Sequence, residues 1–249
     1  MSQTVLVTGA TSGIGESLCL LFASDGYDLV TVARDEEALE KQADELRILG
    51  VDVLPVACDL SDPDSARTIF KRVCKAGKDI DILVNDAGYS PAGQFSDLPV
   101  ADIRAMIQVS VTSLAELTRV FLQPMLERGH GRILNMSSMM AKTPCPYNAL
   151  YGAAKVFVLS FSTALARELR GIKRPIIAVA TKCDAVPRDR VMKHLLSIEK
   201  LGEWAAIVPV SSVEGKGIDH LREVLAQPQY ARFYFHIEEF LKDILPKNF

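Results

Sequence analysis

Three side chains between residues 132 and 155 have the types and the spacing needed to move a proton. Tyr151 and Lys155 stand four residues apart, so on a helix they share one face and point into the same space. A phenol titrates near pH ~10, and a neighbouring ammonium favours its charged form. Tyr151 is therefore a candidate general acid–base that Lys155 tunes, and Ser138 is a candidate hydrogen-bond partner of a substrate carbonyl or hydroxyl.

The segments around these residues predict how they are positioned. The apolar run Arg132–Met136 predicts a buried strand, a loop with Pro144 and Pro146 follows, and a helix then carries the tyrosine and the lysine. Ser138 is expected at the carboxyl end of the strand, where open α/β sheets bind ligands. An ordinary amphipathic helix with a half-buried tyrosine and a solvated lysine has the same spacing, so the hypothesis depends on the segments upstream.

A glycine-rich turn near the N-terminus predicts a nucleotide site. The run Thr4–Thr8 is short, apolar and β-branched, as buried strands are, and an apolar-periodic helix is expected over Glu16–Ser24. Between them lie Gly9, Gly13 and Gly15, in the pattern GxxxGxG. Glycines allow a tight turn and close backbone approach, and a helix N-terminus offers N–H groups to a pyrophosphate. A plain glycine-rich turn between a strand and a helix is the alternative.

The next predicted strands also end in residues that suit a nucleotide. Arg34 follows the strand Asp28–Ala33, and a basic residue there suits the 2′-phosphate of NADP, although a solvated surface arginine fits as well. Asp59, after the strand Asp52–Cys58, either contacts adenine or caps the next helix. The small residues of Asn85–Gly88, after the fourth strand, either admit a ligand close to the backbone or form a simple turn.

The alternation of strands and helices predicts one fold class. It indicates an α/β fold, a Rossmann-like doubly wound parallel sheet with helices on both faces. We expect about seven strands and a single domain over residues 1–249, because no Pro/Gly/Ser-rich linker marks a boundary. A long helix is expected over Ala101–Arg128.

The composition excludes several classes of function. The 249 residues are 49% hydrophobic and 24% charged, as in soluble globular proteins. The net charge of −3 provides no field that attracts nucleic acid or an anionic membrane, and no apolar run reaches the ~18–20 residues of a membrane span. The five cysteines have no metal-like spacing and the four histidines are scattered. This pattern predicts free thiols in a reducing, cytoplasmic compartment and no metal site.

Taken together, these segments resemble a short-chain dehydrogenase/reductase over residues 1–171. The matching motifs are TGATSGIG at 8–15, ARD at 33–35, DL at 59–60, NDAG at 85–88, NMSS ending at Ser138, and YGAAK at 151–155. The resemblance implies an NADP- or NAD-dependent oxidoreductase that transfers hydride to or from a small-molecule carbonyl or alcohol. It implies Tyr151 as proton donor, Lys155 as its tuner and a ribose ligand, and Ser138 as partner of the substrate oxygen. Besides Tyr151 and Lys155, the residues implied to contact the cofactor are Gly9, Thr11, Ser12, Gly13, Ile14, Gly15, Arg34, Asp59, Leu60, Asn85, Ala87 and Gly88.

The chain departs from that family's pattern in two places. Ser110 stands where the family usually has an asparagine, whose backbone carbonyl and helix kink support a water relay to the lysine. We count Ser110 among the catalytic residues and expect slower turnover. The family also continues into a strand that ends in Pro-Gly and holds the nicotinamide carboxamide, and this chain has no such segment.

The C-terminal third resembles a different family. Residues 172–227 predict a βαβα unit, with strands at Arg174–Ala180 and Ala206–Val210, and they resemble the end of a P-loop GTPase of the Era-like kind. The sequence TKCD at 181–184 matches its guanine-reading motif, whereas the phosphate-binding GxxxxGK[ST] is absent. We interpret this unit as completing the same sheet in a chimera, and residues 228–249 as a helical tail.

Two other hypotheses fit parts of the sequence. A catalytically impaired or engineered Rossmann-like scaffold that at most binds a dinucleotide accounts for both departures, and a guanine-nucleotide binding module accounts for TKCD. The first resemblance also implies a homo-oligomer, because copies in that family often pair through the helices expected here at 101–128 and 151–170.

Overall fold

The computed structural model of the chain describes residues 2–91, 93–142, 145–169, 177–181, 206–209 and 235–239, with residues 192, 217, 219 and 220. The chain divides into two compact units. The first comprises Met1–Tyr89 and Pro99–Leu134, and the second comprises Ser90–Leu98 and Asn135–Phe249. The prediction of a single domain stays a prediction.

The first unit contains a parallel sheet in the strand order β3-β2-β1-β4-β5. Its strands are β1 (Thr4–Thr8), β2 (Asp28–Ala33), β3 (Val53–Ala57), β4 (Ile82–Asn85) and β5 (Arg132–Met136), within which the chain passes into the second unit. Every residue of β1, β4 and β5 is buried, as expected of parallel strands that are covered on both faces. The order confirms the Rossmann-like α/β prediction.

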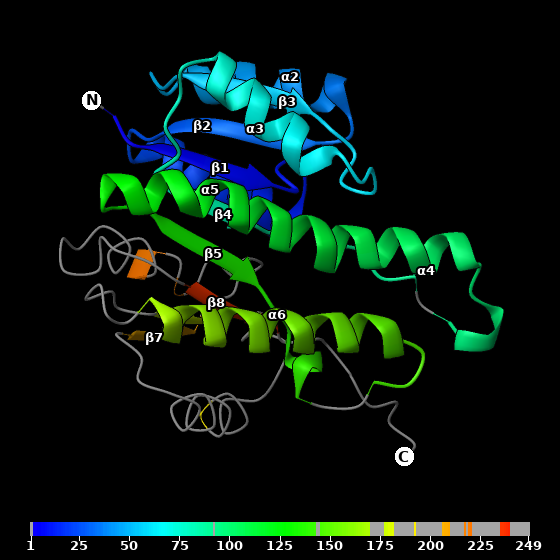
Figure 1. Cartoon of the computed structure of the whole chain (residues 1–249). Coiled ribbons are helices and arrows are strands. Elements are labelled where there is room, and N and C mark those ends of the chain that lie inside the picture. Colours follow the sequence, from blue (N-terminus) through cyan, green and yellow to red (C-terminus); the bar gives the residue numbers. More distant parts are fainter. Residues whose placement is uncertain are drawn as a thin grey trace. The chain divides into compact units, whose positions relative to one another are not determined.

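Helices of the first unit connect these strands (Figure 1). They are α1 (Gly13–Ser24), α2 (Glu36–Arg47), α3 (Ser65–Lys75), α4 (Val100–Ile107) and α5 (Leu114–Arg128). α3 packs against α5, and α1 packs against α2. Two helix pairs therefore cover the sheet, as in a doubly wound fold.

The helix predicted over Ala101–Arg128 contains an irregular turn. Between α4 and α5 lies a π-helical turn, η2 (Gln108–Ser113). π-Helical turns inside α-helices occur often at functional sites. Ser110, the residue that departs from the family's asparagine, lies within this turn.

The second unit holds the helix of the tyrosine and the lysine, α6 (Ala149–Glu168), after the short helix η3 (Met139–Ala141). Another short helix, η1 (Phe95–Asp97), lies in its N-terminal segment. The strands β6 (Ile177–Thr181) and β7 (Ala206–Pro209) pair in parallel. Their first and last residues differ from the predicted ones by at most three positions.

The C-terminal tail differs from its prediction. Where a helix was expected, Phe235–Glu239 forms β8, which pairs in parallel with β6. Aromatic and β-branched residues such as Phe235 and Ile237 favour a strand over a helix, and β6 offers an edge for pairing. The described residues therefore contain eight strands rather than about seven.

Within the part of the chain that the structure describes, two helical segments are long and apolar enough to pass a membrane-span test by length and composition. An 18-residue window within Val100–Arg128 has a mean hydropathy of 1.2, and one within Ala149–Glu168 has 1.5. Of the residues in these windows, 50% are buried in the first and 33% in the second. Core helices of soluble α/β proteins have the same properties, so this finding is weak support for a membrane segment.

Candidate functional site

The glycine-rich turn follows β1 and leads into α1. Gly9 and Gly13 have φ angles of +70° and +56°, which L side chains rarely adopt. Gly15 lies in the first turn of α1, and a Cβ there would stand 2.3 Å from the carbonyl oxygen of Gly9. The spacing GxxxGxG therefore has two causes: a positive φ at Gly9 and Gly13, and close packing at Gly15 and, against the Ala87 backbone, at Gly9.

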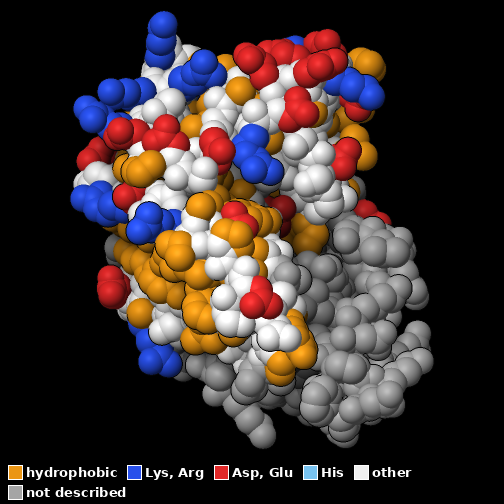
Figure 2. All heavy atoms as spheres, turned by 90° about the vertical axis from the view of Figure 1, so that its right-hand side faces the viewer, with side chains coloured by type: hydrophobic (Ala, Val, Ile, Leu, Met, Phe, Trp, Pro, Cys, Tyr) orange, Lys and Arg blue, Asp and Glu red, His pale blue; other side chains and the backbone are white. Residues whose placement is uncertain are grey.

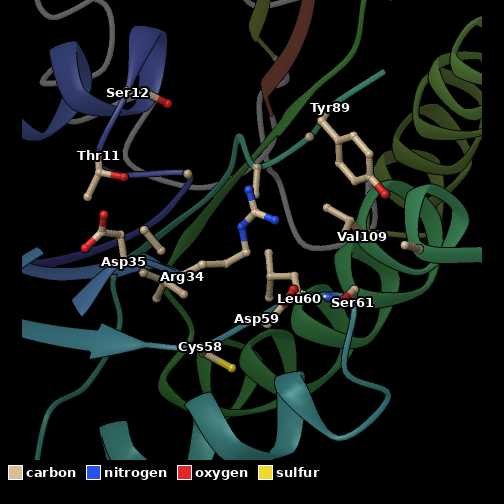
Figure 3. Close-up of a pocket in the computed structure, with 16 residues that line it drawn as sticks. Thr11, Ser12, Arg34, Asp35, Cys58, Asp59, Leu60, Ser61, Tyr89 and Val109 are labelled. Carbon is tan, nitrogen blue, oxygen red and sulfur yellow. Dashed lines mark hydrogen bonds between the residues drawn. The ribbon is translucent and has the colours of Figure 1, made fainter. Parts of the chain in front are cut away.

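A pocket of about 280 Å³ lies in the first unit, at the carboxyl ends of its strands (Figure 3). It contains eight of the residues that the resemblance implies as cofactor contacts: Gly9, Thr11, Ser12, Arg34, Asp59, Leu60, Ala87 and Gly88. The remaining lining residues are Val32, Ala33, Asp35, Cys58, Ser61, Tyr89, Ala105 and Val109. Most of the predicted nucleotide residues are therefore brought together around one space.

In this pocket the basic side chain points into the space, whereas two carboxylates accept hydrogen bonds from backbone N–H groups. Figure 3 shows the guanidinium of Arg34 extending into the space. The Asp35 carboxylate accepts a hydrogen bond from the Ala38 backbone N–H at 3.0 Å and caps α2. Asp59 accepts from the Ser61 N–H at 2.9 Å, so it stabilises the turn and lines the pocket at once. Arg34 is the one basic residue among the lining residues.

Six of the predicted cofactor contacts are not among the lining residues: Gly13, Ile14, Gly15 and Asn85, and Tyr151 and Lys155 of the second unit. Asn85 is 3% exposed and donates from Nδ2 to Thr118 Oγ1 at 3.2 Å. This bond joins the end of β4 to α5. Its position indicates a packing role.

Sequence reasoning missed several residues that shape this region. Thr8 Oγ1 accepts from the backbone N–H groups of Asp86 and Ala87, both at 3.1 Å, and so fixes the turn after β4. Tyr89 lies at the pocket (Figure 3), and burial followed by the charge of Asp102 raises the pKa of its phenol. Burial likewise raises the pKa of the Cys58 thiol. A polar residue at the end of a buried strand was the signal that could have found Thr8.

The proposed proton-transfer residues lie in the second unit. Lys155 is 5% exposed, and its Nζ donates to the Met136 carbonyl at 2.8 Å and stands 5.3 Å from the centre of the Tyr151 ring. Ser138 is fully buried, and its Oγ accepts from the Met140 N–H at 3.2 Å. The alternative of a solvated lysine is therefore wrong, although the tyrosine is half-buried as that alternative required.

The fourth proposed residue, Ser110, belongs to the first unit. Its side chain is 2% exposed, and its Oγ has no hydrogen-bond partner among the residues that the structure describes. A buried hydroxyl without a partner costs stability.

The motif TKCD lies outside the described residues except for Thr181, the last residue of β6. The guanine-reading hypothesis therefore stays a prediction.

Comparison with known proteins establishes the family. The family model of short chain dehydrogenases matches residues 3–187, and the chain belongs to this family. The match extends past residue 171, where the resemblance was expected to end.

Individual proteins support the same assignment. The chain is 37% identical over 171 residues to a short chain dehydrogenase of Pseudocercospora fijiensis, which covers 68% of this chain and 55% of the relative. It is 36% identical over 185 residues to 17-beta-hydroxysteroid dehydrogenase type 3 of Homo sapiens, covering 73% of this chain and 58% of the relative. The match therefore spans little more than half of these relatives. A metagenomic short-chain oxidoreductase solved in complex with NADP is 30% identical, with a TM-score of 0.71 and coverage of 84% of this chain and 96% of that one.

Proposed function

We propose that the protein is an NADP(H)-dependent oxidoreductase that interconverts a carbonyl and an alcohol, with Tyr151 as its general acid–base. The observation that carries this proposal is the buried ammonium of Lys155, 5.3 Å from the Tyr151 ring. Burying an ammonium costs free energy, so its retention beside a phenol suggests chemical use. Membership of the short chain dehydrogenase family supports the same reaction.

The residues of the first unit fit an adenine dinucleotide. The pocket lies at the carboxyl ends of parallel strands, and the positive-φ glycines allow close approach of a phosphate to the backbone. Arg34 favours the 2′-phosphate of NADP, because its guanidinium extends into the pocket while the Asp35 carboxylate is engaged by the Ala38 N–H. The related oxidoreductase in complex with NADP points the same way. NAD stays the second choice.

Each proposed catalytic residue of the second unit then has a defined task. A bound nicotinamide would supply or accept the hydride. Tyr151 gives its proton to the carbonyl oxygen during reduction and takes it back during oxidation. Lys155 favours the phenolate that remains, because an opposite charge nearby stabilises it. Ser138 holds the substrate oxygen by a hydrogen bond.

The first experiment tests the cofactor. NADPH and NADH are titrated by fluorescence against the wild type, Arg34→Ala and Lys41→Ala, a matched loss of an exposed cation on α2 outside the pocket. Loss of a charge-assisted contact predicts about tenfold weaker NADPH binding in Arg34→Ala, with NADH unchanged. Equal effects in Arg34→Ala and Lys41→Ala would remove the argument for NADP.

The second experiment tests the reaction. Tyr151→Phe should retain NADPH affinity and lose reductase activity by at least about a hundredfold, because it removes only the proton donor. Full activity of this variant would refute the assigned role.

The alternative of a silent scaffold, motivated by the unpartnered hydroxyl of Ser110, predicts cofactor binding without turnover of any carbonyl by the wild type. Guanine binding by TKCD predicts GTP affinity that is lost in Asp184→Asn.

Two further expectations concern the protein's surroundings. We propose a homo-oligomer that pairs through α6, since this helix is apolar, Val156 is 45% exposed, and an apolar groove runs beside it between Met140 and Val156. Light scattering of the purified protein, with Val156→Glu as the disrupting variant, tests the proposed oligomer.

We also propose a cytoplasmic location, because all four cysteines in the described part of the chain are free thiols.

A further inference from the structure

Tyr147 has an unusual backbone conformation. Among the described residues it is the one non-glycine residue with a positive φ, at +65°. An aromatic residue in this left-handed region is strained by about 1 kcal/mol or more. Its side chain is 58% exposed, so burial of the ring within the chain does not compensate for the strain. Such outliers persist where the surrounding structure holds them, and they gather at functional sites.

The surrounding backbone holds Tyr147 from both sides. Its carbonyl accepts from the Gly93 N–H at 2.9 Å. The next residue, Asn148, donates its N–H to the Cys145 carbonyl at 3.1 Å and accepts at Oδ1 from Ser90 Oγ at 2.8 Å. These bonds tie the loop before α6 to the segment 90–98, so backbone contacts fix the direction in which the Tyr147 side chain leaves the loop.

This position lies at the start of the helix that carries the proposed acid–base. Tyr147 precedes Tyr151 by four residues, and the Asn148 carbonyl accepts the first bond of α6, from the Gly152 N–H at 2.9 Å. Side chains on a helix tilt toward its N-terminus, so the Tyr151 phenol leans toward the loop that presents Tyr147. A molecule bound at the Tyr151 hydroxyl would therefore lie at the end of α6 that adjoins this loop.

A second exposed aromatic ring lies on the segment bonded to this loop. Phe95, in η1, is 57% exposed. Figure 2 views the side on which α6 begins and shows hydrophobic side chains gathered over part of this face. Charge is sparse in the same two segments, where the described residues carry one cation, Lys142, and one anion, Asp97. A substrate with a carboxylate or sulfonate would find little opposite charge here.

We propose that Tyr147 and Phe95 bind the body of the substrate, and that the substrate is a ketone or secondary alcohol with a bulky apolar body. This inference rests on the proposed oxidoreductase function. The strained loop presents the exposed Tyr147 ring as one apolar contact, and Phe95 provides a second one. Small or charged carbonyl compounds gain nothing from either ring.

The test compares α-tetralone, a two-ring apolar ketone, with D-glyceraldehyde, a small polar aldehyde. The variants are Tyr147→Asn, which tolerates the positive φ without the ring, Tyr147→Phe, which keeps the ring, and Phe95→Ser. Ile48→Ser removes an even more exposed apolar side chain in the first unit and serves as the control. We expect the KM for α-tetralone to rise about tenfold in Tyr147→Asn and Phe95→Ser, with kcat nearly unchanged.

Tyr147→Phe and Ile48→Ser should match the wild type, and no variant should alter the KM for D-glyceraldehyde. Equal KM changes for both substrates, or none in Tyr147→Asn, would overturn the inference. Binding of α-tetralone is also measured by calorimetry in the presence of NADP. If the wild type turns over neither compound, calorimetry decides the inference: a tenfold loss of α-tetralone binding in Tyr147→Asn supports it, and unchanged binding or no binding by the wild type overturns it. The oxidoreductase proposal itself is refuted only if the wild type turns over no carbonyl compound at all.

Discussion

Replacing Gly15 by alanine gives a direct test of how the glycine-rich turn is built. The added Cβ would lie 2.3 Å from the Gly9 oxygen, 2.8 Å from the Gly9 carbonyl carbon and 2.9 Å from Asp86 Oδ2. Real Cβ atoms essentially never approach closer than 3.0 Å, so the backbone must separate by at least 3.0 − 2.3 = 0.7 Å. The obstacle is backbone rather than a flexible side chain, so we expect a cost of about 3 kcal/mol, the upper end for overpacking.

That cost can appear in either of two measurements. If the turn keeps its place, stability falls, and about 3 kcal/mol lowers the Tm by about 6 to 12 °C in a chain of this size. If the turn moves off α1 instead, the pocket that Gly9 lines is distorted and NADPH binding weakens by about a hundredfold. Thermal unfolding and NADPH fluorescence titration of the same preparation together measure both.

Gly13 provides the matched control for this substitution. A Cβ at Gly13 meets nothing within 4 Å, and its φ of +56° is the one source of strain. Gly13→Ala should therefore cost about 1 kcal/mol, and Gly13→Asn less, since asparagine tolerates this region. If Gly15→Ala changes the Tm and the NADPH affinity no more than Gly13→Ala does, the packing account of the third glycine is wrong.

Three other outcomes follow from the same structure. Cys58 lines the pocket and its thiol pKa is raised by burial, so alkylation should be slow at neutral pH, faster at alkaline pH and blocked by NADPH, whereas exposed Cys74 should stay unprotected in the same mass spectrum. Ser110→Ala removes a buried hydroxyl without a partner, so the unfolding free energy of this variant should equal or exceed that of the wild type. Ser110→Asn should raise kcat if the chain lacks the water relay that the family's asparagine supports. Ser162→Ala removes the acceptor of the Asn135 Nδ2 bond at 3.0 Å and should cost about 1–3 kcal/mol in denaturant unfolding; a loss below about 0.5 kcal/mol would show that this buried bond is dispensable.

Local patterns in the sequence predicted most of the fold and much of the candidate site. Five strands, their helices and the pocket residues follow from periodicity and from small or polar residues at strand ends, because those signals are short-range. The tail was misjudged because β8 depends on an edge presented by β6, about sixty residues earlier in the chain. The role of Asn85 depends on Thr118, a partner on a distant helix that no local pattern reveals. Tyr147 looked like an ordinary loop residue because backbone strain leaves no mark on sequence.

The contacts of Lys155 show that its spacing from Tyr151 serves packing as well as chemistry. The ammonium donates to the carbonyl of Met136, the last residue of β5, while the Lys155 carbonyl accepts from Ser137 Oγ at 2.8 Å. One residue of α6 is therefore bonded through both its side chain and its backbone to the end of one strand. Sliding the helix by a single residue would turn Lys155 by 100° and break both bonds. The register of α6 is thus fixed at the point where the phenol must stand, and the serine pair that ends the strand contributes to positioning as well as to the proposed contact with substrate.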